Sequence, residues 1–99
     1  MIVKRAGSRP NTVRIAFQLP STTVASTIHI VGDFNNWDRR SHPLTRSCEK
    51  VPRETIIELE RGKAYQLRYL VDGKLWQNDW RADRYVPNPF GGENSVVQT

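Results

Sequence analysis

The sequence is poor in cysteine and in long apolar runs, and each shortage excludes a class of protein. Its single cysteine, Cys48, can form no internal disulfide. No apolar run approaches the roughly 20 residues that a membrane span requires. Residues 1–10 are basic but lack the apolar core of a secretory signal. Cys48, His29 and His42 do not have the spacing of metal ligands. We therefore expect a cytoplasmic protein without metal or cofactor and without a membrane partner.

Length and composition are those of one small folded domain. The 99 residues are 37 % hydrophobic and 25 % charged, which is typical of a globular chain rather than a disordered one. The net charge of +5 permits an anionic partner. The basic residues are scattered, with no run of five or more, so we interpret them as a solvated surface.

Apolar residues that alternate along the chain predict a β protein. Residues 12–19 and 65–71 alternate most clearly, and the second segment is followed by Asp72-Gly73, a strong hairpin signal. Shorter strands are expected at 24–31, 55–59 and 95–98, with Leu75 and Trp76 on a return strand after the hairpin turn. No window has a helical period. The pattern predicts an antiparallel β-sandwich over residues 12–99, preceded by a flexible basic arm over residues 1–11.

The segment from Ile28 to Asp38 carries the strongest functional signal. A short apolar strand runs into a Gly-Asp turn, where we expect Gly32 to serve the backbone, and then into a polar loop that ends at Trp37. An exposed indole can lie on the C–H face of a sugar ring, while neighbouring amides such as that of Asn36 hydrogen-bond to hydroxyls. The alternative is that Trp37 folds back and caps the core.

Four short motifs occur in a recognisable order. They are Gly32 to Trp37, Pro43-Leu44-Thr45, Tyr69 to Gly73, and Asn94 to Val97. Together they resemble the family 48 carbohydrate-binding modules, which bind glycogen and starch in branching enzymes, isoamylases and the β subunit of AMP-activated protein kinase. The resemblance covers about residues 12–99. It implies an immunoglobulin-like, early-set β-sandwich that binds α-1,4-glucan without catalysis and is associated with glycogen or starch metabolism.

The resemblance also implies a set of site residues. Trp37 and Trp76 match the two tryptophans that stack on sugar rings. Arg68 matches a lysine of the kinase modules that hydrogen-bonds to the glucan, and Asn94 matches a sugar-binding asparagine. Phe90 lies where those modules have an aliphatic residue that reaches over the ligand. With the amide next to Trp37 included, the expected carbohydrate site consists of Trp37, Arg68, Trp76, Asn94, Phe90 and Asn36.

One departure from the family leaves the orientation of Trp76 open. The kinase modules usually have one residue between the Val-Asp-Gly turn and the tryptophan, whereas this chain has two, Lys74 and Leu75. A shift of one residue reverses the face of a regular strand. Either the turn is longer or bulged, or Trp76 faces inward. For Trp80, packing beneath its loop is favoured over a place in the binding surface.

Other functions remain as alternatives. We expect no catalysis, because the amylase-type relatives need a barrel of about 250 residues and the aspartates of this chain lie in turn-like sequence. Basic residues beside aromatics, such as Arg68-Tyr69, are compatible with single-stranded nucleic acid, although we expect no such partner. A third possibility is a module that docks or regulates a glucan-active enzyme of the glycoside hydrolase family 13 type.

Overall fold

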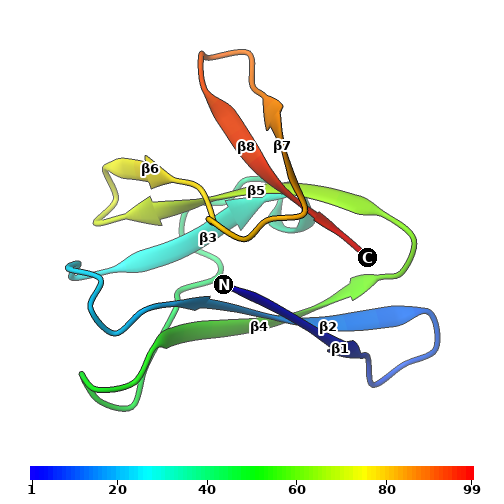
Figure 1. The fold of residues 1–99 in the computed structure, drawn as a ribbon, viewed down its shortest axis with the longest axis horizontal. Helices are drawn as coiled ribbons and strands as arrows, with labels where there is room; N and C mark the ends of the chain where they lie inside the picture. Colours follow the sequence, from blue (N-terminus) through cyan, green and yellow to red (C-terminus); the bar gives the residue numbers. More distant parts are fainter.

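The protein folds into two layers of antiparallel β-strands, as the computed structural model of residues 1–99 shows (Figure 1). The three-stranded sheet has the order β1 (Ile2–Ala6), β2 (Thr12–Leu19) and β4 (Arg53–Glu60). The five-stranded sheet has the order β3 (Ile28–Gly32), β5 (Ala64–Val71), β8 (Glu93–Gln98) and β7 (Arg84–Pro87), with β6 (Leu75–Gln77) paired separately to β5. A one-turn 3-10 helix, η1 (Asp33–Asn35), follows β3. The expected all-β antiparallel sandwich is confirmed, and the structure has no helix long and apolar enough to cross a membrane.

The core lies between the two sheets and follows the predicted alternation. Ile15 and Phe17 of β2 and Leu67 and Tyr69 of β5 are fully buried. The hydroxyl of Tyr69 donates a hydrogen bond of 2.7 Å to the buried carboxylate of Asp79. Burial and the adjacent Asp79 charge raise the pKa of Tyr69 well above its ordinary value. The hydroxyl is therefore held as a neutral donor that satisfies a buried carboxylate.

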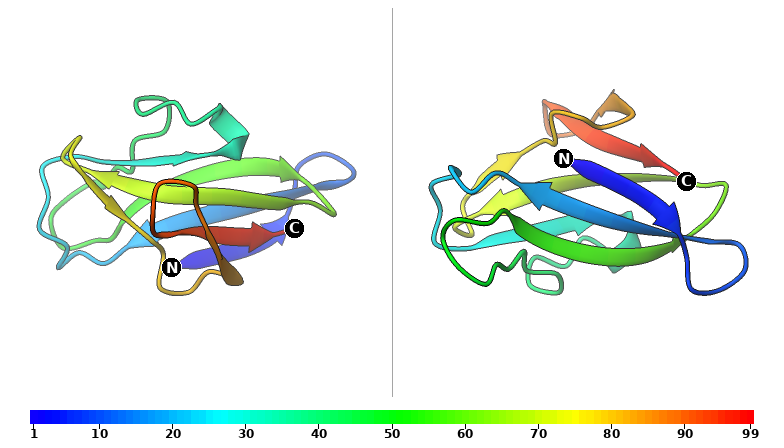
Figure 2. Two further views of the ribbon diagram at one scale, coloured as in Figure 1. Left: turned by 90° about the horizontal axis from the view of Figure 1, so that it is seen from above. Right: turned by 60° about the horizontal axis from the view of Figure 1, so that its bottom comes forward.

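Two edge strands were not expected from the sequence. Residues 1–11 were predicted to be a flexible arm, but Ile2–Ala6 forms β1, with Ile2 opposite Phe17 and Ala6 opposite Val13 of β2. The segment from Arg84 to Pro87 forms β7 on β8, although only two apolar residues mark it. Edge strands are short and tolerate charged residues, so they show little of the alternation that identifies central strands. Figure 2 shows both strands at the margins of the two layers.

The edge of β5 that faces away from β3 is shared by two different strands. Residues 64–67 of β5 pair with β8, whereas Tyr69 to Val71 pair with β6. Between these pairings lies Arg68, where the two partner strands diverge. In Figure 1 β6 lies along β5, and the β7–β8 hairpin rises away from it. The divided edge leaves Arg68 at a fork on the outer face of the five-stranded sheet.

Candidate functional site

A groove of about 770 Å³ lies at this fork. Its walls come from the loop after β3, the strands β5 and β6, and the β7–β8 hairpin. Five of the six residues expected in a carbohydrate site line it, namely Trp37, Arg68, Trp76, Phe90 and Asn94. The other residues that line it are Asp33, Arg39, Gln66, Asn88, Pro89 and Gly91. Side chains that are far apart in the sequence are therefore gathered in one concave surface of the size that small ligands occupy.

The indole of Trp37 is held at the groove by a carboxylate. Its Nε1–H donates to Asp33 Oδ1 at 3.0 Å, and Asp33 Oδ2 accepts the backbone N–H of Gln66 at 2.8 Å. Trp37 is only partly buried and is not part of the core between the sheets. Asp33 thus connects the tryptophan to β5 and sets the orientation of its ring. The alternative that Trp37 caps the core is not what the structure shows.

Gly32 allows this loop to lie close to β5. A Cβ atom at this position would lie 2.5 Å from the backbone oxygen of Gln66 and 3.0 Å from Leu67 Cβ. The backbone of Gly32 is extended, with a φ of −172° that any residue can adopt. The glycine was expected to serve the turn. It is required instead because there is no room for a side chain.

The backbone at the end of η1 is strained. Asn36 and Trp37 both adopt the left-handed conformation, with φ of 55° and 58°. Trp37 N–H donates to Gly32 O at 2.9 Å, and Gly32 N–H donates to the side chain of Asn35 at 3.0 Å. These bonds hold a conformation that costs free energy for a bulky residue, and strain of this kind often occurs at functional sites. Asn36 itself is exposed and does not line the groove, so its expected contact with sugar is not supported by its position.

The register of the β5–β6 hairpin brings Trp76 to the groove. Val71 lies opposite Leu75 and Leu70 lies opposite Trp76. The additional residue, Lys74, is accommodated in the turn, where its N–H donates to Val71 O at 3.0 Å. Trp76 therefore shares the outer face of the sheet with Leu70. The longer-turn alternative is the one that the structure adopts.

The turn before Trp76 is tied to the segment that precedes β3. The carboxylate of Asp72 accepts the backbone N–H groups of Ser26 at 2.7 Å and Thr27 at 3.0 Å. These bonds, that of Thr27 above all, lower the pKa of Asp72 below its ordinary value. Asp72 and Gly73 have φ of 54° and 68°, as the two central residues of a type I′ turn require. The position of Trp76 is thus determined by local turn chemistry together with one long-range contact.

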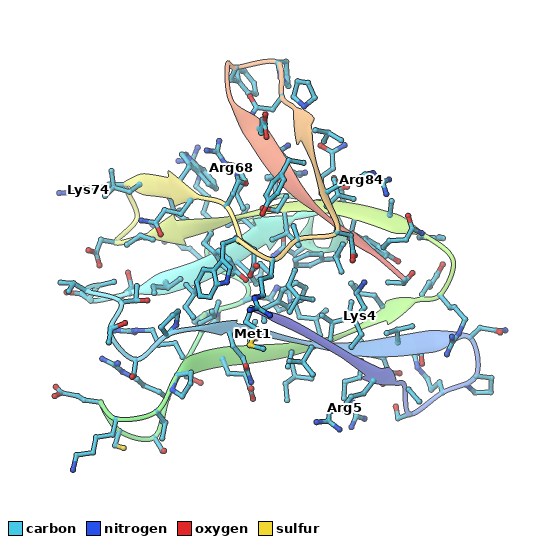
Figure 3. The ribbon with its side chains drawn as sticks, in the orientation of Figure 1. Met1, Lys4, Arg5, Arg68, Lys74 and Arg84 are labelled. Atoms are coloured by element: carbon cyan, nitrogen blue, oxygen red, sulfur yellow. The ribbon has the colours of Figure 1, made fainter.

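Two guanidinium groups lie over the ring of Trp76. The Cζ atoms of Arg39 and Arg68 are 5.4 and 5.8 Å from its ring centroid, within the range of a cation–π interaction. Figure 3 shows Arg68 above β5, between β6 and the β7–β8 hairpin. Arg39 was not expected in the site, because a loop residue two positions after Trp37 has no periodicity that would indicate its direction. Both groups supply positive charge next to an aromatic surface.

Asn94 and the β7–β8 hairpin form the remaining wall. Asn94 was expected to bind sugar, but it is only 7 % exposed. Its Nδ2 donates to Gln66 Oε1 at 3.0 Å, and its Oδ1 accepts from Asn88 Nδ2 at 3.4 Å. At the tip of the hairpin, Phe90 is 94 % exposed. Gln66 was also missed, although it alternates with Arg68 along β5 and therefore shares its face.

Trp80 lies outside this arrangement. The expectation that it packs beneath its loop is wrong, because it is 55 % exposed. It does not line the groove either. The segment from β6 to β7 follows the surface here, and the neighbouring Asp79 is the residue that turns inward. Trp80 therefore provides an exposed tryptophan away from the site, which is useful as an internal reference.

The groove offers aromatic rings, amides, two guanidinium groups and a single carboxylate. Asp33 is its one carboxylate, and both of its oxygens already accept hydrogen bonds. The structure contains no group of three or more histidine, cysteine, aspartate or glutamate side chains placed to hold a metal ion. Comparison of the sequence with protein-family models and with curated proteins gives no match.

Proposed function

We propose that this protein binds α-1,4-glucan, such as glycogen, starch or a maltooligosaccharide, and performs no chemistry on it. The proposal includes its place as an immunoglobulin-like, early-set sandwich similar to the family 48 carbohydrate-binding modules. One observation carries it. Five residues expected to bind carbohydrate come from four separate segments of the chain and line a single groove.

The arrangement of polar and aromatic groups supports a sugar ligand. The Trp37 N–H is already satisfied by Asp33, so the ring can contact the apolar face of a pyranose without leaving a donor unpaired. Gln66 and Asn94 place amide groups at the same surface, and amides both donate to and accept from hydroxyls. Such a shallow site exchanges hydration for modest contacts. We expect dissociation constants of about 10 µM to 1 mM, with little dependence on salt for a neutral glucan.

The three tryptophans allow a direct test by NMR. Isotopically labelled protein is titrated with maltoheptaose while the three indole N–H signals are followed. We expect saturable shifts for Trp37 and Trp76, which line the groove, and none for Trp80, which does not. Shifts confined to Trp80, or no shifts at millimolar maltoheptaose, would contradict the proposal.

Two matched variants separate binding from folding. Trp37→Ala removes an aromatic surface from the groove, and we expect it to abolish the maltoheptaose response. Trp80→Ala removes the same side chain from an exposed position outside the groove, and we expect it to retain the response. Unfolding midpoints of both proteins show whether either change has disturbed the fold. Equal binding by the two variants would remove Trp37 from the site.

A second candidate function is docking to a glucan-active enzyme. The observation that favours it is Phe90, a large apolar side chain that is 94 % exposed at the tip of the β7–β8 hairpin. Exposed aromatic residues often serve as anchors at protein interfaces. Retention of maltoheptaose binding by Phe90→Ala would leave this residue free for a partner, whereas loss of binding would assign it to the glucan site.

A further inference from the structure

We infer that the groove takes a glucan that carries an anionic substituent, of which a phosphate monoester is the chemical type, and that Arg39 and Arg68 receive this group beside Trp76. The inference rests on the proposed glucan site and narrows its ligand class. The two guanidinium groups lie over one ring, with their Cζ atoms 5.4 and 5.8 Å from its centroid, and neither takes part in an ion pair.

Neither arginine is neutralised by the protein. None of the five ion pairs includes Arg39 or Arg68, and neither guanidinium donates a hydrogen bond to another residue. The Nε of Arg68 is buried without any partner. By contrast, Arg9 and Arg14 lie 3.1 and 3.7 Å from the carboxylate of Glu58 on the other sheet. The cations of Arg39 and Arg68 therefore lie beside one ring, at 5.4 and 5.8 Å from its centroid, without an anion of the protein to neutralise them.

The one carboxylate in the groove does not fill this role. Asp33 accepts hydrogen bonds from the Trp37 indole and from the Gln66 backbone, and it forms no ion pair with either arginine. The groove therefore contains two guanidinium groups and only one carboxylate. The remaining lining residues are uncharged, and the groove has a net positive charge.

Their position over Trp76 leaves the arginines able to bind an anion. A guanidinium that lies over an aromatic ring still has N–H donors along its planar edge. The spacing of these donors matches that of the oxygens of a phosphate. A phosphate monoester offers three acceptor oxygens and nearly two negative charges at neutral pH. The ring of Trp76 thus positions the arginines, and the partly buried Trp37 remains for the sugar.

A sugar phosphate fits these observations better than a nucleic acid. A single strand is usually held by a positively charged groove that follows its backbone over several nucleotides. Here only two cations line the groove, and four of the other basic residues, Lys4, Arg9, Arg14 and Lys63, are paired with carboxylates elsewhere. The amides and the aromatic rings that line the groove with the two arginines suit a ligand with one or two charges and many hydroxyls.

The test compares two forms of the same glucan. A phosphorylated maltodextrin and a sample of it dephosphorylated by phosphatase are titrated into the protein at 50 and 500 mM salt. We expect the phosphorylated form to bind about tenfold more tightly at 50 mM salt, because it adds charge-assisted hydrogen bonds to two arginines. The advantage should shrink at 500 mM salt, where screening is stronger. The dephosphorylated form should bind equally at both salt concentrations.

Three variants assign the preference to specific arginines. The ratio of the dissociation constant of the dephosphorylated dextrin to that of the phosphorylated dextrin should fall toward one in Arg39→Gln and in Arg68→Gln. Arg40→Gln removes the same charge from the neighbouring position, which does not line the groove, and it should keep the ratio of the unmodified protein. Arg39 is exposed, so its variant should fold normally even if replacement of the partly buried Arg68 disturbs the sheet.

Each outcome bears on a different claim. Equal binding of both dextrins would overturn this inference and leave the glucan proposal standing. No binding of either dextrin would overturn both. Tighter binding of an oligothymidylate than of the phosphorylated dextrin would also overturn the inference and favour a nucleic-acid ligand. An unchanged ratio in Arg39→Gln and Arg68→Gln, with a reduced ratio in Arg40→Gln, would show that the anion binds outside the groove.

Discussion

The left-handed backbone at Trp37 leads to an unusual prediction about stability. The residue has a φ of 58°, a conformation that glycine adopts freely and that other residues adopt at a cost. Removal of the side chain in two ways, as Trp37→Ala and Trp37→Gly, takes away the same indole contacts. The two variants then differ only in a methyl group and in how easily the backbone reaches its native angles. We expect Trp37→Gly to be the more stable of the two.

The size of the difference follows from two opposing effects. The left-handed conformation costs a non-glycine residue about 1–2 kcal/mol. Glycine in turn loses more backbone entropy on folding, which costs about 0.5–1 kcal/mol relative to alanine. The first effect exceeds the second, so Trp37→Gly should be favoured by about 0.5–1 kcal/mol. For a domain of this size that corresponds to a difference of several degrees in the unfolding midpoint.

The assay is urea unfolding of four variants in parallel. Trp80 provides the matched control, because it is exposed and does not have a positive φ. There the order should reverse, with Trp80→Ala more stable than Trp80→Gly by about 0.5–1 kcal/mol. If Trp37→Ala were as stable as Trp37→Gly or more so, the argument from strain at this loop would fail. If the alanine and glycine variants had the same order of stability at Trp37 and at Trp80, backbone strain at Trp37 would likewise not explain the result.

Two further predictions concern other parts of the fold. Gly32→Ala should destabilise the protein by about 1–3 kcal/mol, because the new Cβ would lie 2.5 Å from the backbone oxygen of Gln66; an unchanged urea midpoint would contradict this. Hydrogen bonds from Ser8 and Arg9 lower the pKa of Glu58 to about 2, from an ordinary value of 4.5. The stability that these bonds contribute should therefore be complete above pH 4.5 and be lost as the pH falls toward 2. In Glu58→Gln this part of the acid dependence should be missing from unfolding curves measured across the window.

The central strands were predictable because each follows from a local pattern. The segment 12–19 was expected as a strand, and Thr12–Leu19 is β2; the segment 65–71 was expected, and β5 begins one residue earlier, at Ala64. In both, alternation of apolar residues reflects a sheet with one face on the core, which is a property that neighbouring residues share. β1 and β7 were missed for the opposite reason. An edge strand gains its place from the strand beside it, and its own sequence need not alternate.

The site was predictable only in part, because some of its contacts depend on segments that are distant in the sequence. A resemblance in short motifs indicated Trp37, Arg68, Trp76, Phe90 and Asn94, and the structure places all of them in one groove. It did not indicate that Asn94 is engaged with other amides, since those partners come from β5 and from the hairpin. Their approach depends on how the two pairings of β5 divide at Arg68. No local pattern contains that information.

The sequence by itself determined the class of fold, the main strands and the turns, because backbone preferences and the alternation of burial act over a few residues. Only the tertiary structure decided which way Trp76 faces, since that depends on a register in which Lys74 belongs to the turn. The same is true of the two arginines over its ring. Arg39 comes from a loop and Arg68 from a strand, and side chains so far apart in the chain reach the same ring only when the sheet has formed.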